Sequence, residues 1–220
     1  MNRKQCITKI ETIMKKLMMI LMAFCLTMPV AVNAQSKMVK KMVKDKVKDY
    51  KKRGYEIFGS SLTLDVALTK HYTKIEENGE KVQEIPGFAH AKSRNLAATQ
   101  AQNSAATRYS TQASAQVKGR MVADMSNEIS ENPTEFEKFY AAYQTKVEQE
   151  IRGELRPSFM VKKENADGSI DVEAYYLVDE DAASRARIQA FRNTQNESEV
   201  AQKYAQRVSD FINEKVTATE

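Results

Sequence analysis

Most of the chain carries the apolar spacing of amphipathic helices, in which apolar side chains recur every three or four residues. In each such stretch the apolar residues fall on one side of a helical wheel and polar residues fill the other. One stretch differs because it is rich in Ala, Gln, Ser and Thr, and we expect it to be helical since Ala and Gln propagate a helix well. The stretches predicted to be helical are residues 37–53, 64–78, 91–125, 132–153 and two segments within residues 182–212.

Two of these helices have distinctive features. In the Ala-rich helix, small side chains allow a close approach to whatever element it crosses, and these are Ala97, Ala98, Ala101, Ala105 and Ala106. The helix of residues 132–153 has a strong start signal, because Asn132 can cap it, Pro133 fits the first turn and Glu135 occupies the capping-box position. Its apolar stripe is largely aromatic, and such a stripe is far more often protein core than a ligand cage. The stripe consists of Phe136, Phe139, Tyr140, Tyr143, Val147 and Ile151.

Four shorter stretches predict β-strands. Residues 55–58 form a short strand closed by Gly59, and residues 82–91 are extended with Pro86, which favours an edge strand or a bulge. Residues 159–163 and 170–178 flank a turn with Gly168 at the left-handed position, so they predict a β-hairpin. In its second strand Ile170, Val172, Ala174, Tyr176 and Val178 alternate with Asp171, Glu173 and Tyr175, which predicts one buried face and one at least partly wet face.

These elements predict an α+β fold of two layers. A small, mainly antiparallel sheet packs against long helices and is preceded by a basic amphipathic helix. The predicted domain organisation is a signal peptide at residues 1–34, the basic helix at residues 35–54 and a single α+β domain at residues 55–220, with a possible hinge at Arg53 and Gly54.

The N-terminal segment has the pattern of a secretory signal peptide. Lys15 and Lys16 precede an apolar run over residues 17–28, which is too short for a stable membrane span. Val32 and Ala34 then place small residues before a cut at Gln35, and Met14 is the preferred start. Lipidation at Cys25 is disfavoured because Phe24 replaces the small residue that lipoprotein processing requires. We therefore expect an exported protein, periplasmic or envelope-associated or extracellular.

Removal of residues 1–34 changes the charge of the protein. The whole chain has 34 basic and 29 acidic residues, and five of the basic residues and one acidic residue belong to this segment. The remaining chain has net charge +1, so the basic pI of the full sequence is no argument for nucleic-acid binding. Both cysteines, Cys6 and Cys25, also lie in the removed segment, which excludes disulfides and thiolate chemistry from the mature chain.

Positive charge is concentrated in residues 37–53, which hold nine basic and two acidic residues, a net charge of +7. One interpretation is a helix that binds an anionic surface or polymer, or makes peripheral membrane contact. The other, which we favour, is a helix that packs its Val and Met stripe on its own domain while the lysines stay solvated. The candidate binding residues are Lys37, Lys40, Lys41, Lys44, Lys48, Lys51 and Lys52.

The inventory for catalysis is thin. His71 lies between Leu68 and Ile75 on an apolar stripe, which favours a hydrogen-bonded core histidine over a ligand. No metal site, nucleotide loop or cofactor motif is expected, and an enzyme is not predicted. The rival interpretation is a secreted hydrolase that uses His71 or His90 with nearby carboxylates. That interpretation predicts that His71 and His90 converge on an open cleft.

Three segments carry a resemblance to a known family. They are Tyr55-Glu56-Ile57-Phe58-Gly59, the run from Ala91 to Ala98, and Asp167-Gly168-Ser169 leading to Ala174-Tyr175-Tyr176-Leu177-Val178. Over about residues 55–180 the chain resembles the LPP20-like family of small envelope proteins, which is related in fold to the N-terminal domain of the flagellar protein FlgT. The resemblance implies a structural or adhesive envelope role and brings no catalytic residues. We therefore expect a non-enzymatic envelope protein that is structural or binds another macromolecule, such as an envelope protein or an anionic polymer, and not nucleic acid.

Overall fold

The computed structural model describes residues 36–196, 199–203 and 205–213. The helices and strands named below all belong to the larger of the two units into which the chain divides, the one that begins at Lys37. The predicted signal peptide, its cleavage position and Cys25 lie outside the described residues. Within the described part of the chain, no helix is both long enough and apolar enough to span a membrane.

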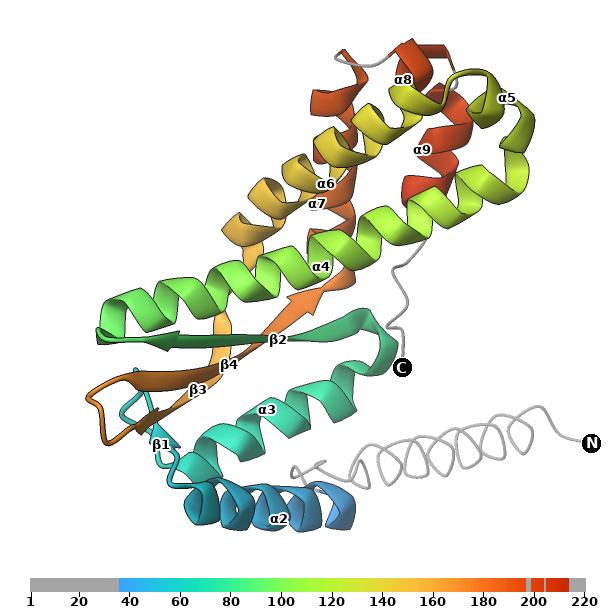
Figure 1. Ribbon diagram of the computed structural model, residues 1–220. Helices are drawn as coiled ribbons and strands as arrows, with labels where there is room; N and C mark the ends of the chain where they lie inside the picture. Colours follow the sequence, from blue (N-terminus) through green and yellow to red (C-terminus); the bar gives the residue numbers. More distant parts are fainter. Residues whose placement is uncertain (1–35, 197–198, 204, 214–220) are drawn as a thin grey trace, which may run out of the picture. The chain divides into compact units, whose positions relative to one another are not determined.

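The larger unit is mainly helical, with one small sheet (Figure 1). The N-terminal half contains α2 (Lys37–Arg53), β1 (Glu56–Ile57), α3 (Leu64–Asn78), a 3-10 turn η1 (Gly79–Lys81), β2 (Val82–Ala91) and α4 (Arg94–Asp124). The C-terminal half contains α5 (Ser126–Glu131), α6 (Pro133–Glu154), β3 (Pro157–Glu164), β4 (Ile170–Asp179), α7 (Glu180–Gln195), α8 (Glu199–Lys203) and α9 (Ala205–Asn213).

The four strands form one antiparallel sheet in the order β1-β3-β4-β2. β3 and β4 are joined by the predicted hairpin, in which Gly168 has a φ of 77°. β2 is an edge strand, as Pro86 indicated. The N–H of Phe88 donates to Ser104 Oγ over 3.3 Å rather than to β4, and Pro86 lies two residues earlier on the same side. The missing donor of Pro86 therefore costs no hydrogen bond within the sheet.

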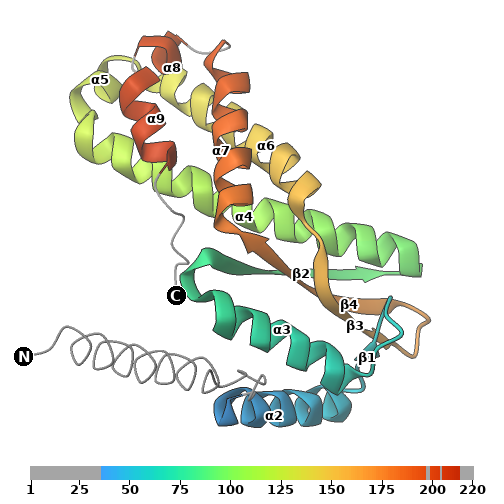
Figure 2. The ribbon, with the colours of Figure 1, turned by 180° about the vertical axis from the view of Figure 1, so that it is seen from behind.

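One face of the sheet, the α4 face, packs against the Ala-rich helix (Figures 1 and 2). The two backbones approach so closely that a Cβ added to Gly87 would lie 2.0 Å from the carbonyl oxygen of Ala101. Ala97 and Ala105 are buried in the same core, so the small side chains of α4 do permit the close approach that the sequence predicted. The aromatic stripe of α6 is also buried, as predicted.

α4 continues past the sheet into a helical bundle with α6, α7 and α9, and one core runs through both parts. A buried arginine joins three of these helices. Arg187 on α7 donates to the hydroxyl of Tyr109 on α4 over 2.6 Å, to Glu180 Oε1 over 2.7 Å and to the carbonyl oxygen of Ile212 on α9 over 3.0 Å. Such a buried cation is tolerated because each of its nitrogens has an acceptor.

The opposite face, the α3 face, is covered by α3 and α2 (Figures 1 and 2). A second, smaller apolar cluster lies there, formed by Val39, Val43, Tyr50, Leu64, Ala67, Leu68, Phe159 and Val161. The α+β class and the small antiparallel sheet are confirmed. Helices lie against both sides of the sheet, but the α3 face is covered only in part, as expected. Glu173 is buried there, Asp171 and Tyr175 are half-buried, and Glu84 and His90 on β2 are exposed.

Two local features differ from the sequence-based expectation. Asn132 begins α6 but its side chain makes no capping hydrogen bond. Its backbone N–H, to which Glu135 would bond in a capping box, instead closes α5 by donating to the carbonyl oxygens of Glu128 and Ile129. The position expected to be a hinge is a defined helix end, since Gly54 adopts a φ of 80° and its N–H donates to the carbonyl oxygen of Lys51.

Candidate anionic-surface interface

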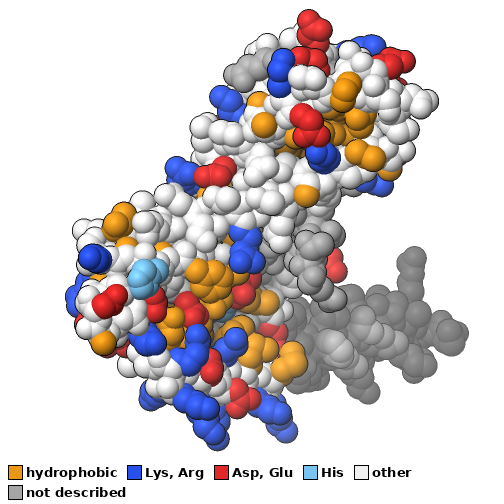
Figure 3. Space-filling model, in the orientation of Figure 1, with side chains coloured by type: hydrophobic (Ala, Val, Ile, Leu, Met, Phe, Trp, Pro, Cys, Tyr) orange, Lys and Arg blue, Asp and Glu red, His pale blue; other side chains and the backbone are white. Residues whose placement is uncertain are grey.

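The seven candidate lysines all lie on one side of α2. At 100° per residue they occupy an arc of about 120° on the helical wheel, and every position within that arc is a lysine. All seven are exposed. We call this surface the lysine face, and it consists of Lys37, Lys40, Lys41, Lys44, Lys48, Lys51 and Lys52. In the space-filling view, basic side chains gather along the lower margin of the molecule, where α2 lies (Figure 3).

Within the described part of the chain, none of the seven ammonium groups forms an ion pair with a carboxylate. Asp45 and Asp49 fall beside the arc rather than in it, and Asp49 pairs with Arg53 instead. The eighth lysine of the helix, Lys46, is exposed but lies about 120° away from the nearer edge of the arc. The positive charge of the lysine face is therefore not neutralised by its own helix.

Burial of the apolar stripe of α2 leaves the lysine face exposed to solvent. Val39, Val43 and Tyr50 are buried against α3 and the sheet, on the side of the helix roughly opposite the lysines. The sequence left open whether this helix docks on its own domain, and the structure places it there. The wide separation of the two stripes means that docking costs the lysines no contact with solvent.

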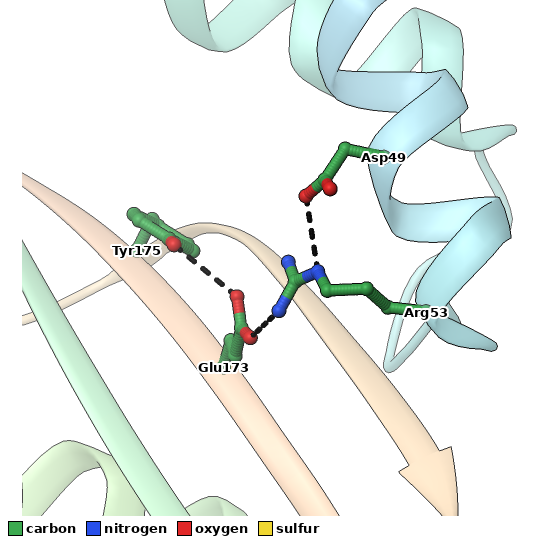
Figure 4. Close-up of polar contacts among 4 residues, drawn as sticks. All are labelled: Asp49, Arg53, Glu173 and Tyr175. Atoms are coloured by element: carbon green, nitrogen blue, oxygen red, sulfur yellow. Dashed lines mark hydrogen bonds and ion pairs between the residues drawn. The ribbon is translucent and has the colours of Figure 1, made fainter.

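A polar clamp fixes the C-terminal end of α2 to the sheet (Figure 4). Arg53 donates from Nη1 to Glu173 Oε1 over 2.7 Å and from Nε to Asp49 Oδ2 over 3.0 Å. Glu173 lies on β4 with a side chain only 11 % exposed, and it also accepts from the hydroxyl of Tyr175 over 3.3 Å. The clamp therefore joins residues 120 positions apart in the chain.

The end of α2 is shaped to present Arg53 to this clamp. Tyr55 N–H donates to the carbonyl oxygen of Tyr50, and with the bond from Gly54 to Lys51 this completes a Schellman motif. The guanidinium of Arg53 lies over both rings, 4.9 Å from the centroid of Tyr50 and 4.8 Å from that of Tyr55. Arginine suits this position because its planar group can stack and donate in a fork at the same time.

The surroundings raise the pKa of two groups in the clamp, Arg53 and Tyr50. The hydrogen bond to Glu173 raises the pKa of Arg53 above its ordinary value despite the opposing effect of burial, so the guanidinium stays charged. Burial raises the pKa of Tyr50 well above its ordinary range, with further contributions from Tyr175 and Glu173. Tyr50 is therefore a neutral phenol, and the charged groups of the clamp are Arg53 and the two carboxylates.

His71 is fully buried and hydrogen-bonded through both ring nitrogens, as expected of a core histidine. Its Nδ1 lies 3.0 Å from Ser158 Oγ and its Nε2 lies 2.5 Å from Glu84 Oε2. Since the carboxylate can only accept, Nε2 donates to it, and the serine hydroxyl can serve Nδ1 as donor or acceptor. Ser158 reaches the histidine because a β-bulge between Pro157 and Phe159 turns its side chain to the α3 face.

His90 lies elsewhere. Its imidazole is 63 % exposed, and Nδ1 is 2.6 Å from Asp171 Oδ1 on the neighbouring strand. This hydrogen bond is the largest cause that lowers the pKa of Asp171 below its usual value. Glu84 and His90 are six residues apart on β2, so the two histidine sites are about 20 Å apart along the strand.

The two histidines therefore do not converge on one cleft. The surface hollows of the described residues include one beside α6 and α7, one at the start of α7 and one along α4, and no histidine lines these three. Ser158, His71 and Glu84 do form a hydrogen-bonded chain, but the imidazole has no exposed surface at which to exchange a proton with a substrate. Their geometry fits a bridge between α3, β2 and β3. Among the described residues, no group of three or more His, Cys, Asp or Glu side chains could hold a metal ion.

Sequence reasoning missed the partners of these polar residues. Glu173 was assigned to a partly wet face, yet it is the nearly buried acceptor for Arg53. One signal was present, because Arg53 is the only arginine among the basic residues of α2 and directly precedes a helix-ending glycine. No local pattern marks Ser158 as the partner of His71.

Comparison of the chain with family models, with curated proteins and with solved structures found no match.

Proposed function

We propose that this is a non-enzymatic, exported protein of the cell envelope that binds an anionic macromolecule or surface through the lysine face of α2. One observation carries the proposal. Seven lysines fill every position of one exposed arc, and no carboxylate of the described residues pairs with them. A solvated helix face needs only mixed charge to stay soluble, whereas an unbroken arc of one sign creates a field that attracts anions.

The distribution of charge over the chain supports the proposal. Residues 37–53 carry a net charge of +7, and the rest of the chain after residue 34 carries about −6. This acidic remainder could have neutralised α2, but the described carboxylates form no ion pair with the lysine face. The field of the lysine face is therefore available to a partner.

Export is supported by the N-terminal pattern and by the resemblance to LPP20-like envelope proteins. In this proposal the mature chain begins at Gln35, two residues before α2, and carries no lipid. Mass spectrometry of the exported protein tests this part. An N-terminus at Gln35 is expected, and an acylated N-terminus at Cys25 contradicts it.

The binding proposal is tested with a panel of anionic probes at low ionic strength: heparin, polyphosphate and vesicles that contain phosphatidylglycerol. The natural protein is compared with the triple variant Lys41→Gln, Lys44→Gln and Lys48→Gln, which removes three charges from the lysine face. We expect at least one probe to bind the natural protein and the variant to bind it much more weakly. Binding to none of the probes, or equal binding by both proteins, contradicts the proposal.

A further inference from the structure

We propose that the partner of the lysine face is the surface of a phospholipid bilayer with anionic headgroups, and that α2 lies on this surface without leaving its own domain. This inference rests on the function proposed above and names its partner.

The shape of the lysine face favours a flat partner. From Lys37 to Lys51 it extends about 21 Å along a single straight helix, at 1.5 Å per residue. The helix is the outermost layer on the α3 face of the sheet, so its lysines stand on a convex ridge (Figures 1 and 3). Flexible polyanions are typically held in a basic groove that follows their backbone, whereas a ridge can meet a plane along its whole length. Long side chains at the edges of the arc, such as Lys40 and Lys52, can extend to the same plane.

The chemistry of the lysine face also favours headgroups over a specific polymer. It contains no arginine for bidentate phosphate recognition and no aromatic ring on which a base or sugar could stack. The arginine of α2 is already engaged with Glu173 and Asp49. Lysine is a compact point charge, and attraction to an anionic membrane surface requires only such charges within a Debye length of it.

The buried stripe sets the depth of binding. A helix that inserts into a bilayer uses its apolar side, but Val39, Val43 and Tyr50 are committed to the cluster on the α3 face and Arg53 clamps the helix end. The large apolar side chain that α2 leaves exposed is Met38, at 67 %, and it lies beside the arc rather than within it. Binding is therefore electrostatic and superficial.

The first experiment measures partition of the purified, naturally processed protein onto vesicles of phosphatidylcholine with and without phosphatidylglycerol. Binding is expected only to the anionic vesicles, and it should weaken steeply from low to several hundred millimolar salt. Because each lysine near such a surface adds about fivefold to partition, the Lys41, Lys44 and Lys48 triple variant should bind about 100-fold more weakly. The control triple Lys70→Gln, Lys74→Gln and Lys92→Gln makes the same charge change outside α2 and should lose much less.

A matched pair of single variants tests the arc itself. Lys46 and Lys48 are exposed lysines two residues apart on the same helix, but only Lys48 belongs to the lysine face. Lys48→Gln should weaken partition about fivefold and Lys46→Gln should weaken it less. Equal losses would mean that total charge, and not this face, governs binding, and would overturn the assignment. Lys48→Arg should bind like the natural protein, since only charge is required.

Docking of α2 during binding is tested with a fluorescent label at Met38→Cys, which is a unique site because residues 35–220 contain no cysteine. A small spectral shift on anionic vesicles is expected. A shift typical of the acyl region would show that α2 leaves the domain and inserts, which overturns that part of the inference.

The outcomes separate this inference from the proposed function. If heparin or polyphosphate binds through the lysine face and anionic vesicles do not, the bilayer is the wrong partner and the proposed function stands. If no anionic probe binds, both fail.

Discussion

The two faces of the sheet are held in different ways. On the α4 face, small side chains bring the helix and strand backbones together, and a continuous apolar core extends from the sheet into the bundle. On the α3 face, the apolar cluster is small, and polar contacts supplement it. Glu173 accepts a hydrogen bond from Arg53, and His71 is hydrogen-bonded to both Glu84 and Ser158.

This difference separates the closely packed core of the domain from the surface for which we propose binding. Close packing on the α4 face leaves little room for change, because an added methyl group would meet backbone atoms. The α3 face carries the lysine face on its outer helix, and directional contacts there fix how that helix is oriented. Because the two faces differ in this way, substitutions on them should differ in both size and kind of effect.

The largest effect is expected from Gly87→Ala on the α4 face. The new Cβ would lie 2.0 Å from the carbonyl oxygen and 2.9 Å from the carbonyl carbon of Ala101, so β2 and α4 must separate. We expect the free energy of unfolding to fall by about 3 kcal/mol, measured by chemical denaturation.

The control for this variant is Gly119→Ala within α4, where a Cβ meets nothing within 4 Å. It should stabilise the protein by about 0.5–1 kcal/mol, because alanine favours the helix. A loss below about 1 kcal/mol for Gly87→Ala would show that the close approach is easily relieved.

On the α3 face, Arg53→Ala should have the next largest effect. It removes the cationic partner of the nearly buried Glu173, which keeps only tyrosine hydroxyls such as that of Tyr175 near it, and it removes the contacts with the rings of Tyr50 and Tyr55. Since Arg53 itself is 41 % exposed, we discount the cost of a fully buried pair to about 2 kcal/mol.

Hydrogen exchange distinguishes loosening of α2 from general instability. In Arg53→Ala, amides of α2 should exchange faster while those of α4 change less. The adjacent Lys52→Ala should stay within about 0.5 kcal/mol of the natural protein, because Lys52 is exposed. Similar losses for the two variants would refute the clamp.

A smaller effect is expected from His71→Leu. The variant leaves Ser158 and Glu84 without their buried partner, but Glu84 is partly exposed and can be hydrated, so the cost should be about 1–2 kcal/mol. Vesicle binding should be unchanged in the folded variant. If a biological activity disappeared while folding and binding were retained, the hydrolase interpretation would replace ours.

The smallest effect concerns His90 at the exposed end of β2. His90→Ala removes the hydrogen bond that lowers the pKa of Asp171, so NMR titration should find that pKa moved up toward its usual value. A carboxyl whose folded-state pKa is lowered stabilises the fold above its unfolded-state pKa and loses this contribution as pH falls through the folded-state value. The variant should therefore be less stable than the natural protein at neutral pH, by less than about 1 kcal/mol, and the difference should vanish in strong acid. An unchanged Asp171 titration would contradict this account.

Periodicity predicted the elements of this fold but not their polar partners. The stripe of α6, the hairpin around Gly168 and the edge position of Pro86 follow from local spacing, and the structure has all three. The sequence could not reveal that Glu173 meets Arg53, because alternation along a strand says which side a residue faces and not what covers that side. The seven lysines could be grouped from sequence, whereas the finding that they form no ion pair with a described carboxylate required the structure.

The arginine that joins α4, α7 and α9 also has a consequence for the order of folding. The acceptors of Arg187 include Tyr109, 78 residues earlier, and the carbonyl oxygen of Ile212, 25 residues later. β2 must likewise wait for β4, about 90 residues downstream, before it can pair. Because the partners are far apart in sequence, most of the polypeptide must be synthesised before the core can close. Contacts between such distant residues also form slowly. A chain that stays open until its C-terminal region appears is well suited to threading through a membrane channel before it folds.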